Sequence, residues 1–132
     1  MKSRINTRVT IKPKIIGYCL DNAKKDILMN IAQELNTDIC FVGTESAGEK
    51  VGYIAQINGI TRIGNNVENP PECEVLIMSG LKSTVIDKVL KALKSNNISI
   101  DLKCTVTPVN QNWELYRLIE ELQREHKAMH EK

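Results

Sequence analysis

The sequence lacks the cysteine patterns that mark metal sites or disulfide scaffolds. Its four cysteines are Cys19, Cys40, Cys73 and Cys104. None of them forms a C-x-x-C pair, and no pair has zinc-finger spacing. Each cysteine lies in or beside a predicted strand, where a free thiol behaves as a small buried hydrophobe. We therefore expect reduced thiols and no bound zinc.

Long apolar runs and aromatic residues are also scarce. No run approaches the ~18 residues of a membrane-spanning helix. The first 14 residues are charged and contain no apolar segment of the kind found in secretory signals, so we expect a cytoplasmic protein. The chain has one Trp, one Phe and three Tyr among 132 residues. Its core must therefore be built from Ile, Leu and Val.

No catalytic motif is complete. Residues 43–50, GTESAGEK, look superficially like a phosphate-binding loop, but the G-x-x-x-x-G-K-[ST] spacing is missing and Val51 replaces the hydroxyl that would bind Mg²⁺. His126 and His130 are four residues apart on one predicted helix, but Lys127 occupies the place of the general base in H-E-x-x-H. We expect no metal and no cofactor, and the sequence favours a protein that is not an enzyme.

The net charge of +2 is distributed unevenly. Five basic residues and no acidic one precede Ile15, which leaves 13 basic against 16 acidic residues in the rest of the chain. The five are Lys2, Arg4, Arg8, Lys12 and Lys14. A basic arm of this kind binds nucleic acid or an acidic membrane surface, or it is a solvated terminus that aids solubility. The spacing of the charges favours the second interpretation.

Strand and helix patterns alternate along the chain. Short apolar or alternating runs predict strands at 14–20, 39–42, 74–78 and 98–107. Each is followed by residues with helical periodicity, and either Asp21 or Asn22 is a suitable N-cap for the first helix. The order of elements is strand, helix, strand, helix, repeated once. Alternation of this kind is typical of α/β folds with right-handed crossovers.

This order suggests an internal duplication. The arm is residues 1–13, and a single α/β domain at 14–132 contains halves 14–57 and 74–130, joined by a connector at 58–73 rich in Gly, Asn and Pro. A shift of 62 aligns Ile27, Leu28 and Ile31 with Val89, Leu90 and Leu93. We expect a mainly parallel four-stranded sheet with strand order 2-1-3-4 and helices on both faces.

In open parallel sheets, ligands bind beyond the carboxyl ends of the strands, where the strand order reverses. The residues expected at this rim, and hence the ligand-binding candidates, are Cys19, Thr44, Ser79, Gly80 and Thr107. The reversal point lies between Cys19 and Ser79. Every α/β fold has such a rim, and its Gly and Ser residues also serve tight turns, so this pattern alone does not establish a ligand.

The stretch from Cys104 to His126 joins the last strand to the longest helix. Pro108 ends the strand, Asn110 and Asn112 are candidate N-caps, and a helix is expected from about Trp113 to Met129. Asn110, Trp113 and Tyr116 are candidate partner-binding residues, because aromatic side chains often anchor interfaces. The alternative, which we favour from sequence, is that Trp113 and Asn110 hold this helix against the end of the sheet.

The same stretch resembles a bacterial domain family of unknown function. The resemblance rests on a T-P-x-N-x-x-W…E-L-x-x-E-H signature, formed by Thr107-Pro108, Asn110, Trp113, Glu121-Leu122 and Glu125-His126. Met78-Ser79-Gly80-Leu81 extends it upstream, so that it covers roughly residues 74–130. It implies bacterial origin and a short α/β domain, and it supplies no activity, cofactor or catalytic residue.

Two function hypotheses follow. The first is a non-catalytic interaction or regulatory module that docks an unknown protein partner through the last helix or the basic arm. The second is a small-molecule binding protein or enzyme that uses the strand-end rim. A pocket lined by the rim residues would favour the second hypothesis.

Overall fold

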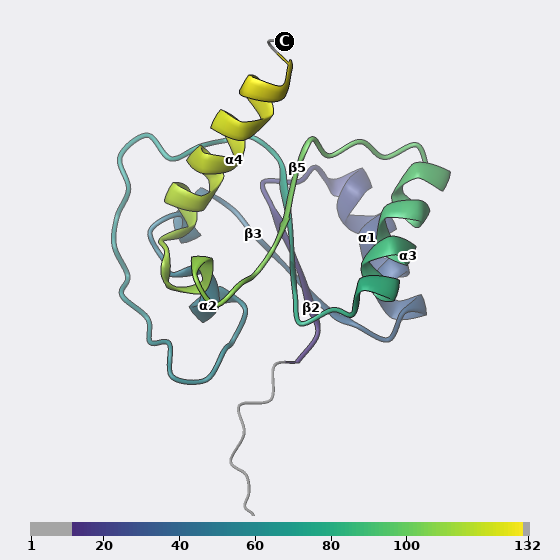
Figure 1. The fold of residues 1–132 in the computed structure, drawn as a ribbon, viewed down its shortest axis with the longest axis horizontal. Helices are drawn as coiled ribbons and strands as arrows, with labels where there is room; N and C mark the ends of the chain where they lie inside the picture. The colour runs from purple at the N-terminus through teal and green to yellow at the C-terminus, as the bar shows by residue number, and fades with distance from the viewer. Residues whose placement is uncertain (1–11, 131–132) are drawn as a thin grey trace, which may run out of the picture.

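The computed structural model describes residues 12–130, which form a four-stranded sheet between two layers of helices (Figure 1). The first half contains β2 (Lys14–Tyr18), α1 (Asn22–Glu34), β3 (Asp38–Val42), η1 (Thr44–Ser46) and α2 (Val51–Ile54). The second half contains β4 (Val75–Ser79), α3 (Ser83–Ser95), β5 (Leu102–Thr105), η2 (Asn110–Asn112) and α4 (Leu115–His130).

The strand order is β3-β2-β4-β5, which confirms the predicted order 2-1-3-4. The prediction of a mainly parallel sheet is wrong, because the sheet is mixed. β2 pairs in parallel with β3, and β4 in parallel with β5, but the central strands β2 and β4 are antiparallel. The connector brings the chain back beside the end of β2: Val75 pairs with Tyr18, whose hydroxyl donates a 2.6 Å hydrogen bond to the carbonyl of Pro71.

Helices cover both faces of the sheet, as predicted. α1 and α3 lie on one face, α2 and α4 lie on the other, and the connector loops around the α2 side (Figure 1). On the α1 side the core contains Ile15, Leu28, Leu76 and Val89, and on the α4 side it contains a separate cluster that includes Ile77. Both clusters are aliphatic in the main, as the scarcity of aromatic residues predicted.

A side-chain cap marks the start of α1, and a similar turn ends both α1 and α3. The Asp21 side chain accepts a 2.9 Å hydrogen bond from the backbone of Lys24 and so caps α1. Asn36 after α1 and Asn97 after α3 both adopt positive φ, near +55° and +57°. In each case the next residue donates back into the helix, Thr37 to Ala32 and Ile98 to Leu93. This is the usual way in which an Asn ends a helix.

The helices α1 and α3 lie 61 residues apart along the chain, whereas the sequence predicted a shift of 62. α1 and α3 both have 13 residues, and their bounds differ by 61. The buried Leu28 corresponds to the buried Val89 at this spacing, whereas the predicted shift of 62 pairs it with Leu90, which is 36% exposed. Cys19 and Gly80, which follow β2 and β4, both have positive φ at the same spacing.

Two element boundaries differ from the sequence prediction for local reasons. β5 is confined to Leu102–Thr105 instead of extending over 98–107, and the Lys103 ammonium folds back onto the carbonyl of Ile100 at 2.6 Å. α4 begins at Leu115 rather than Trp113, because Trp113 is extended (ψ 147°) and bonds to another segment.

Candidate functional site

The turn after β5 is held by one amide side chain. Asn110 accepts a 2.8 Å hydrogen bond from the backbone N–H of Thr107 and donates to the carbonyl of Thr105 at 3.1 Å. Its own N–H donates to the Thr107 hydroxyl at 3.0 Å. Asn110 is only 9% exposed. It therefore fixes the turn, and it does not cap α4 as the sequence had suggested.

Beyond this turn the chain pairs with the segment that precedes α2. Lys50 and Glu114 form an antiparallel bridge. The Val51 N–H donates to the carbonyl of Trp113 at 2.9 Å, and the Leu115 N–H donates to the carbonyl of Glu49 at 2.8 Å. This pairing holds Trp113 in extended conformation at the junction of α2, η2 and α4.

A buried carboxylate attaches the connector to this junction. Glu49 is 8% exposed and accepts hydrogen bonds from the backbone N–H of Ile63 at 3.0 Å and from Nε of Arg62 at 3.1 Å. Burial raises the pKa of Glu49, but the N–H groups of Ile63 and Gly64 and the Arg62 guanidinium outweigh it, so the pKa lies below the usual value. Asn65 adds a second attachment by donating to the Glu114 carboxylate at 3.1 Å.

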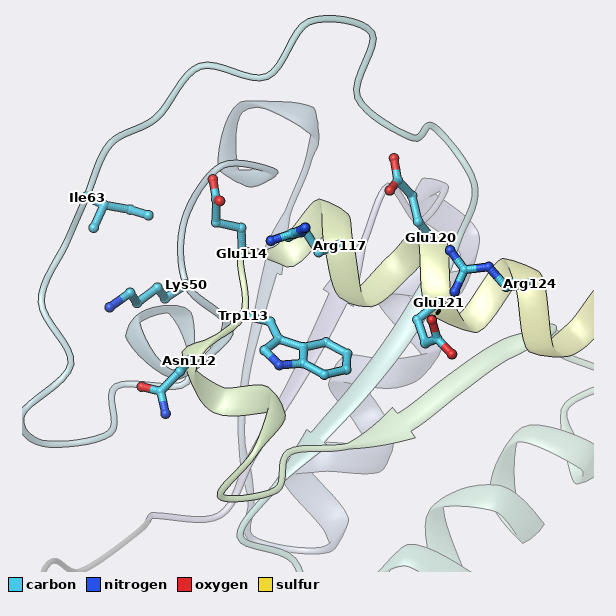
Figure 2. Close-up of a pocket in the computed structure, with 9 residues that line it drawn as sticks. All are labelled: Lys50, Ile63, Asn112, Trp113, Glu114, Arg117, Glu120, Glu121 and Arg124. Atoms are coloured by element: carbon cyan, nitrogen blue, oxygen red, sulfur yellow. Dashed lines mark hydrogen bonds and ion pairs between the residues drawn. The ribbon is translucent and has the colours of Figure 1, made fainter.

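Trp113 lies in a groove of about 410 Å³ between the connector and α4. Figure 2 shows the indole in the middle of the groove, with Lys50 and Asn112 on one side and Glu121 and Arg124 on the other. The ring is 37% exposed, and its indole N–H has no hydrogen-bond partner within residues 12–130. Ile63 of the connector, 38% exposed, adds a second apolar surface to the groove.

The charged side chains of the groove differ in their pairing. Arg124 forms an ion pair with Glu121 on the same helix, and Glu114 accepts the bond from Asn65. Within the described part of the chain, Lys50 and Arg117 make no side-chain hydrogen bond and no ion pair. Two cations are therefore available to a ligand beside the exposed indole.

The three predicted partner-binding residues do not share one surface. Trp113 lines the groove, whereas Asn110 is buried and occupied by the turn. Tyr116 lines a separate, polar hollow of about 500 Å³ with the connector residues Asn65 to Glu68. Partner binding by these residues stays a prediction, and the exposed indole makes Trp113 the strongest of the three.

The five predicted ligand-binding residues are divided between the two opposite ends of the sheet, where its strands begin or end. Cys19 and Thr44 follow the ends of β2 and β3, whereas Ser79, Gly80 and Thr107 lie at or beyond the ends of β4 and β5. Lys14, at the start of β2, pairs with Ser79. The expected single rim with a reversal point between Cys19 and Ser79 is thus incompatible with the antiparallel central pair. Ligand binding by each residue stays a prediction.

Lys14 does not belong to an exposed basic arm. It is 9% exposed, and its ammonium donates to the carbonyl of Ile54 at 3.3 Å and to the Gln56 amide oxygen at 2.8 Å. Lys12 is 82% exposed at its side chain and lies 3.9 Å from Asp38. The other members of the predicted arm, Lys2, Arg4 and Arg8, lie outside the described residues.

Ser79 carries an unpaired polar atom in the core. Its side chain is 1% exposed, and its hydroxyl has no hydrogen-bond partner among the described residues. Lys14 is its neighbour across the β2–β4 pair, but the Lys14 ammonium bonds to α2 and to Gln56.

A second hollow gathers polar side chains that sequence reasoning left apart. It measures about 460 Å³, lies at the amino ends of β4 and β5, and is lined by Lys24, Cys73, Glu74, Ser99, Asp101, Leu102, Gln123 and His126. The Gln123 amide donates to the Cys73 sulfur at 3.3 Å. The spacing of Gln123 and His126, three apart on α4, was the available signal for a shared helix face.

The four thiols are poor nucleophiles in these surroundings. Burial raises the pKa of Cys19, Cys40 and Cys73, and it raises the pKa of Cys104 to about 12. A thiol whose pKa is raised carries little thiolate at neutral pH, and the thiolate is the reactive form. All four cysteines are free in the structure, and their reduced state stays a prediction.

Two kinds of feature are absent from the part of the chain that the structure describes. Between residues 12 and 130, no group of three or more His, Cys, Asp or Glu side chains is placed to hold a metal ion. Over the same range, no helix is both long and apolar enough to cross a membrane.

Comparison with known proteins bears on the second half of the chain. No curated protein and no solved structure matches the sequence. Residues 74–129, which run from the start of β4 through α4 and include Trp113, match the family described as a domain of unknown function (DUF3783).

Proposed function

We propose that the protein is a non-catalytic interaction module that binds a segment of another protein in the groove around Trp113. The observation that carries this proposal is the only Trp of the chain, 37% exposed in a groove of about 410 Å³. A large aromatic ring with an unbonded N–H is a typical anchor of protein interfaces, because it offers apolar area and a directional donor together.

The surroundings of the indole suit a peptide better than a substrate. The groove has rigid walls, since main-chain bonds join residues 49–51 to 113–115 and Glu49 holds the connector. The unpaired Lys50 and Arg117 provide charge beside the ring. The raised pKa values of the four thiols argue against cysteine nucleophiles.

A displayed library of random 12-residue peptides, which span about 40 Å when fully extended, tests this function. We expect wild-type protein to enrich a consensus sequence with a bulky apolar residue, and Trp113→Ala to lose it. Tyr53→Ala is the matched control, because Tyr53 is similarly exposed, at 38%, but does not line the groove. A synthetic consensus peptide should then change the fluorescence of the single Trp. Equal enrichment by wild type and Trp113→Ala would contradict the proposal.

The hollow around Cys73 supports a second candidate, a small-molecule binding site. It brings a thiol, the His126 imidazole and the Asp101 carboxylate to one cavity of about 460 Å³, within the size range of ligand pockets. A fragment screen by nuclear magnetic resonance, with Asp101→Asn and Gln123→Ala as variants, distinguishes the candidates. Fragments that shift residues of this hollow and none near Trp113 would favour the second.

The duplication of a β-α-β-α unit is part of our proposal. Supporting observations are the 61-residue spacing of helix bounds and of the paired positive-φ positions Cys19 and Gly80, and Asn36 and Asn97. We also retain a bacterial, cytoplasmic setting as part of this proposal, supported by the family resemblance and by the four free cysteines, which suit a reducing compartment. Expression of residues 74–132 alone tests the duplication. A half that once folded as a unit should form a dimer, in which a second copy of this half takes the place of residues 14–57.

A further inference from the structure

The outer edge of the sheet at β5 presents unpaired main-chain groups. β5 is the last strand in the order β3-β2-β4-β5. The Val106 N–H donates to the carbonyl of Met78 at 2.9 Å, and main-chain groups alternate in direction along a strand. The main-chain N–H and C=O groups of Leu102 and Cys104 therefore point toward β4, and those of Lys103 and Thr105 point outward.

Asn110 already forms hydrogen bonds with some of the outward main-chain groups. Its amide donates to the outward carbonyl of Thr105 at 3.1 Å and its oxygen accepts from the N–H of Thr107 at 2.8 Å. The N–H and C=O of Lys103 and the N–H of Thr105 form no hydrogen bond with any residue between 12 and 130. Three adjacent groups thus remain open to a strand from another chain.

An apolar hollow lies beside these groups, between α3 and β5. It measures about 280 Å³. Its apolar walls are Leu90, Leu93, Ile98 and Ile100, and its charged members are Lys94 and Lys103. No carboxylate lines it, so its charge is positive and unbalanced. An apolar floor with two lysines at its margin complements a segment that carries apolar and acidic side chains.

We propose that β5 binds an extended, acidic segment of a partner protein, which adds a fifth strand antiparallel to β5. One residue of the segment exchanges two main-chain hydrogen bonds with Lys103, and its neighbour two positions away accepts a third from the N–H of Thr105. Side chains two residues apart face the same side of a strand. An apolar side chain opposite Lys103 therefore enters the hollow, and carboxylates two residues away lie near Lys94 and Lys103.

This surface is separate from the groove at Trp113, and the inference does not depend on the function proposed for that groove. β5 and α3 contribute none of the residues that line the groove. The two proposals can therefore succeed or fail independently.

The test uses the full chain and the capped peptide Thr-Glu-Thr-Val-Thr-Glu-Thr, in which Val and both Glu share one face. Amide hydrogen exchange is followed at Lys103 and Thr105, with the inward-facing Cys104 as internal control. Without peptide, we expect Lys103 and Thr105 to exchange quickly and Cys104 slowly. With peptide, exchange at both outward amides should slow at least ~10-fold, because each becomes hydrogen-bonded.

Four matched probes, two altered peptides and two protein variants, distinguish strand addition from non-specific binding. A peptide with Lys in place of Glu, and one N-methylated at the Val amide, should give no protection, because the first reverses charge and the second cannot donate to Lys103. Lys103→Glu should weaken binding of the acidic peptide about three- to tenfold. Trp113→Ala should bind it as wild type does. Slow exchange at Cys104 verifies that each variant is folded.

Several outcomes would overturn the inference. One is unchanged exchange at Lys103 and Thr105 at millimolar peptide. Another is equal protection by the N-methylated peptide. A third is self-association of Lys103→Thr without any peptide binding, which would show that Lys103 only guards the edge against pairing with other chains.

Discussion

Glu49→Gln should loosen the connector and destabilise the protein, because this carboxylate is the main attachment of residues 58–73 to the body. The residue is 8% exposed, and its carboxylate accepts hydrogen bonds from the Ile63 N–H at 3.0 Å and from Arg62 at 3.1 Å. The substitution keeps the shape of the side chain but removes its charge. The amide NH₂ of Gln also faces either the Ile63 N–H or the Arg62 guanidinium, and a donor cannot bind another donor. Hydrogen bonds to buried charged groups contribute about 1.5–3 kcal/mol each, so a loss of ~2 kcal/mol is expected.

This loss should be measurable in both chemical and thermal unfolding. For a chain of this length, ~2 kcal/mol corresponds to a fall of about 7 °C in the unfolding midpoint. Urea unfolding at pH 7, followed by far-ultraviolet circular dichroism, gives the free energy directly. Glu120→Gln is the matched control, because Glu120 is an exposed residue of α4 and should change the free energy of unfolding very little.

The pH dependence gives a sharper test. The pKa of Glu49 is lower in the folded protein than its usual value of 4.5, so its stabilisation is present above that value. It is lost as the pH falls through the lower, folded-state pKa. The difference between wild type and Glu49→Gln should therefore be largest near neutral pH and shrink below about pH 4.5. A difference that is absent at pH 7, or that stays constant down to pH 3, would refute this reasoning.

Three further substitutions test the surrounding structure. Trp113→Ala should cost about 1–2 kcal/mol in urea unfolding, below the 3–5 kcal/mol of a fully buried ring, because 37% of the residue is exposed; a larger loss would mean that the ring is mainly structural. Asn110→Ala should cost about 2 kcal/mol, because the Thr107 N–H and Thr105 carbonyl lose their partner, and amide exchange at Thr107 should quicken. Gly48→Ala should cost about 1–3 kcal/mol, since a Cβ there collides with the Asn65 carbonyl; unchanged thermal stability would show that the connector yields freely.

The strand order was predictable, whereas the direction of the central pair was not. Continuous apolar runs such as Ile15–Tyr18 and Val75–Met78 indicate where strands lie and that both of their faces are buried. They contain no information on whether two strands run parallel. The connector at 58–73 is long enough to return the chain to either end of β2. One contact of the antiparallel arrangement is the hydrogen bond from the Tyr18 hydroxyl to the Pro71 carbonyl, which joins β2 to the connector, two segments that have no common sequence pattern.

In the last part of the chain, too, the sequence pattern predicted the helix but not the contacts before it. The helical periodicity of Leu115, Leu118 and Ile119 predicted α4 and its buried face, and these residues are 0–3% exposed. The role of Asn110 was misassigned, because a side chain that suits an N-cap also suits a turn. Asn110 holds the turn instead of capping α4, because the main-chain groups that bind its amide, the Thr105 carbonyl and the Thr107 N–H, lie before it in the chain and not in the helix.

The antiparallel centre of the sheet has a consequence for where a site can form. In a parallel sheet, all strand carboxyl ends share one edge, and residues after strands are the natural candidates. Here the carboxyl ends of β2 and β3 lie at the same end of the sheet as the amino ends of β4 and β5. A site at that end must combine residues that follow strands with residues that precede them. Cys73 and Asp101, which line the hollow below α4, precede β4 and β5 and so fall outside any search restricted to strand ends.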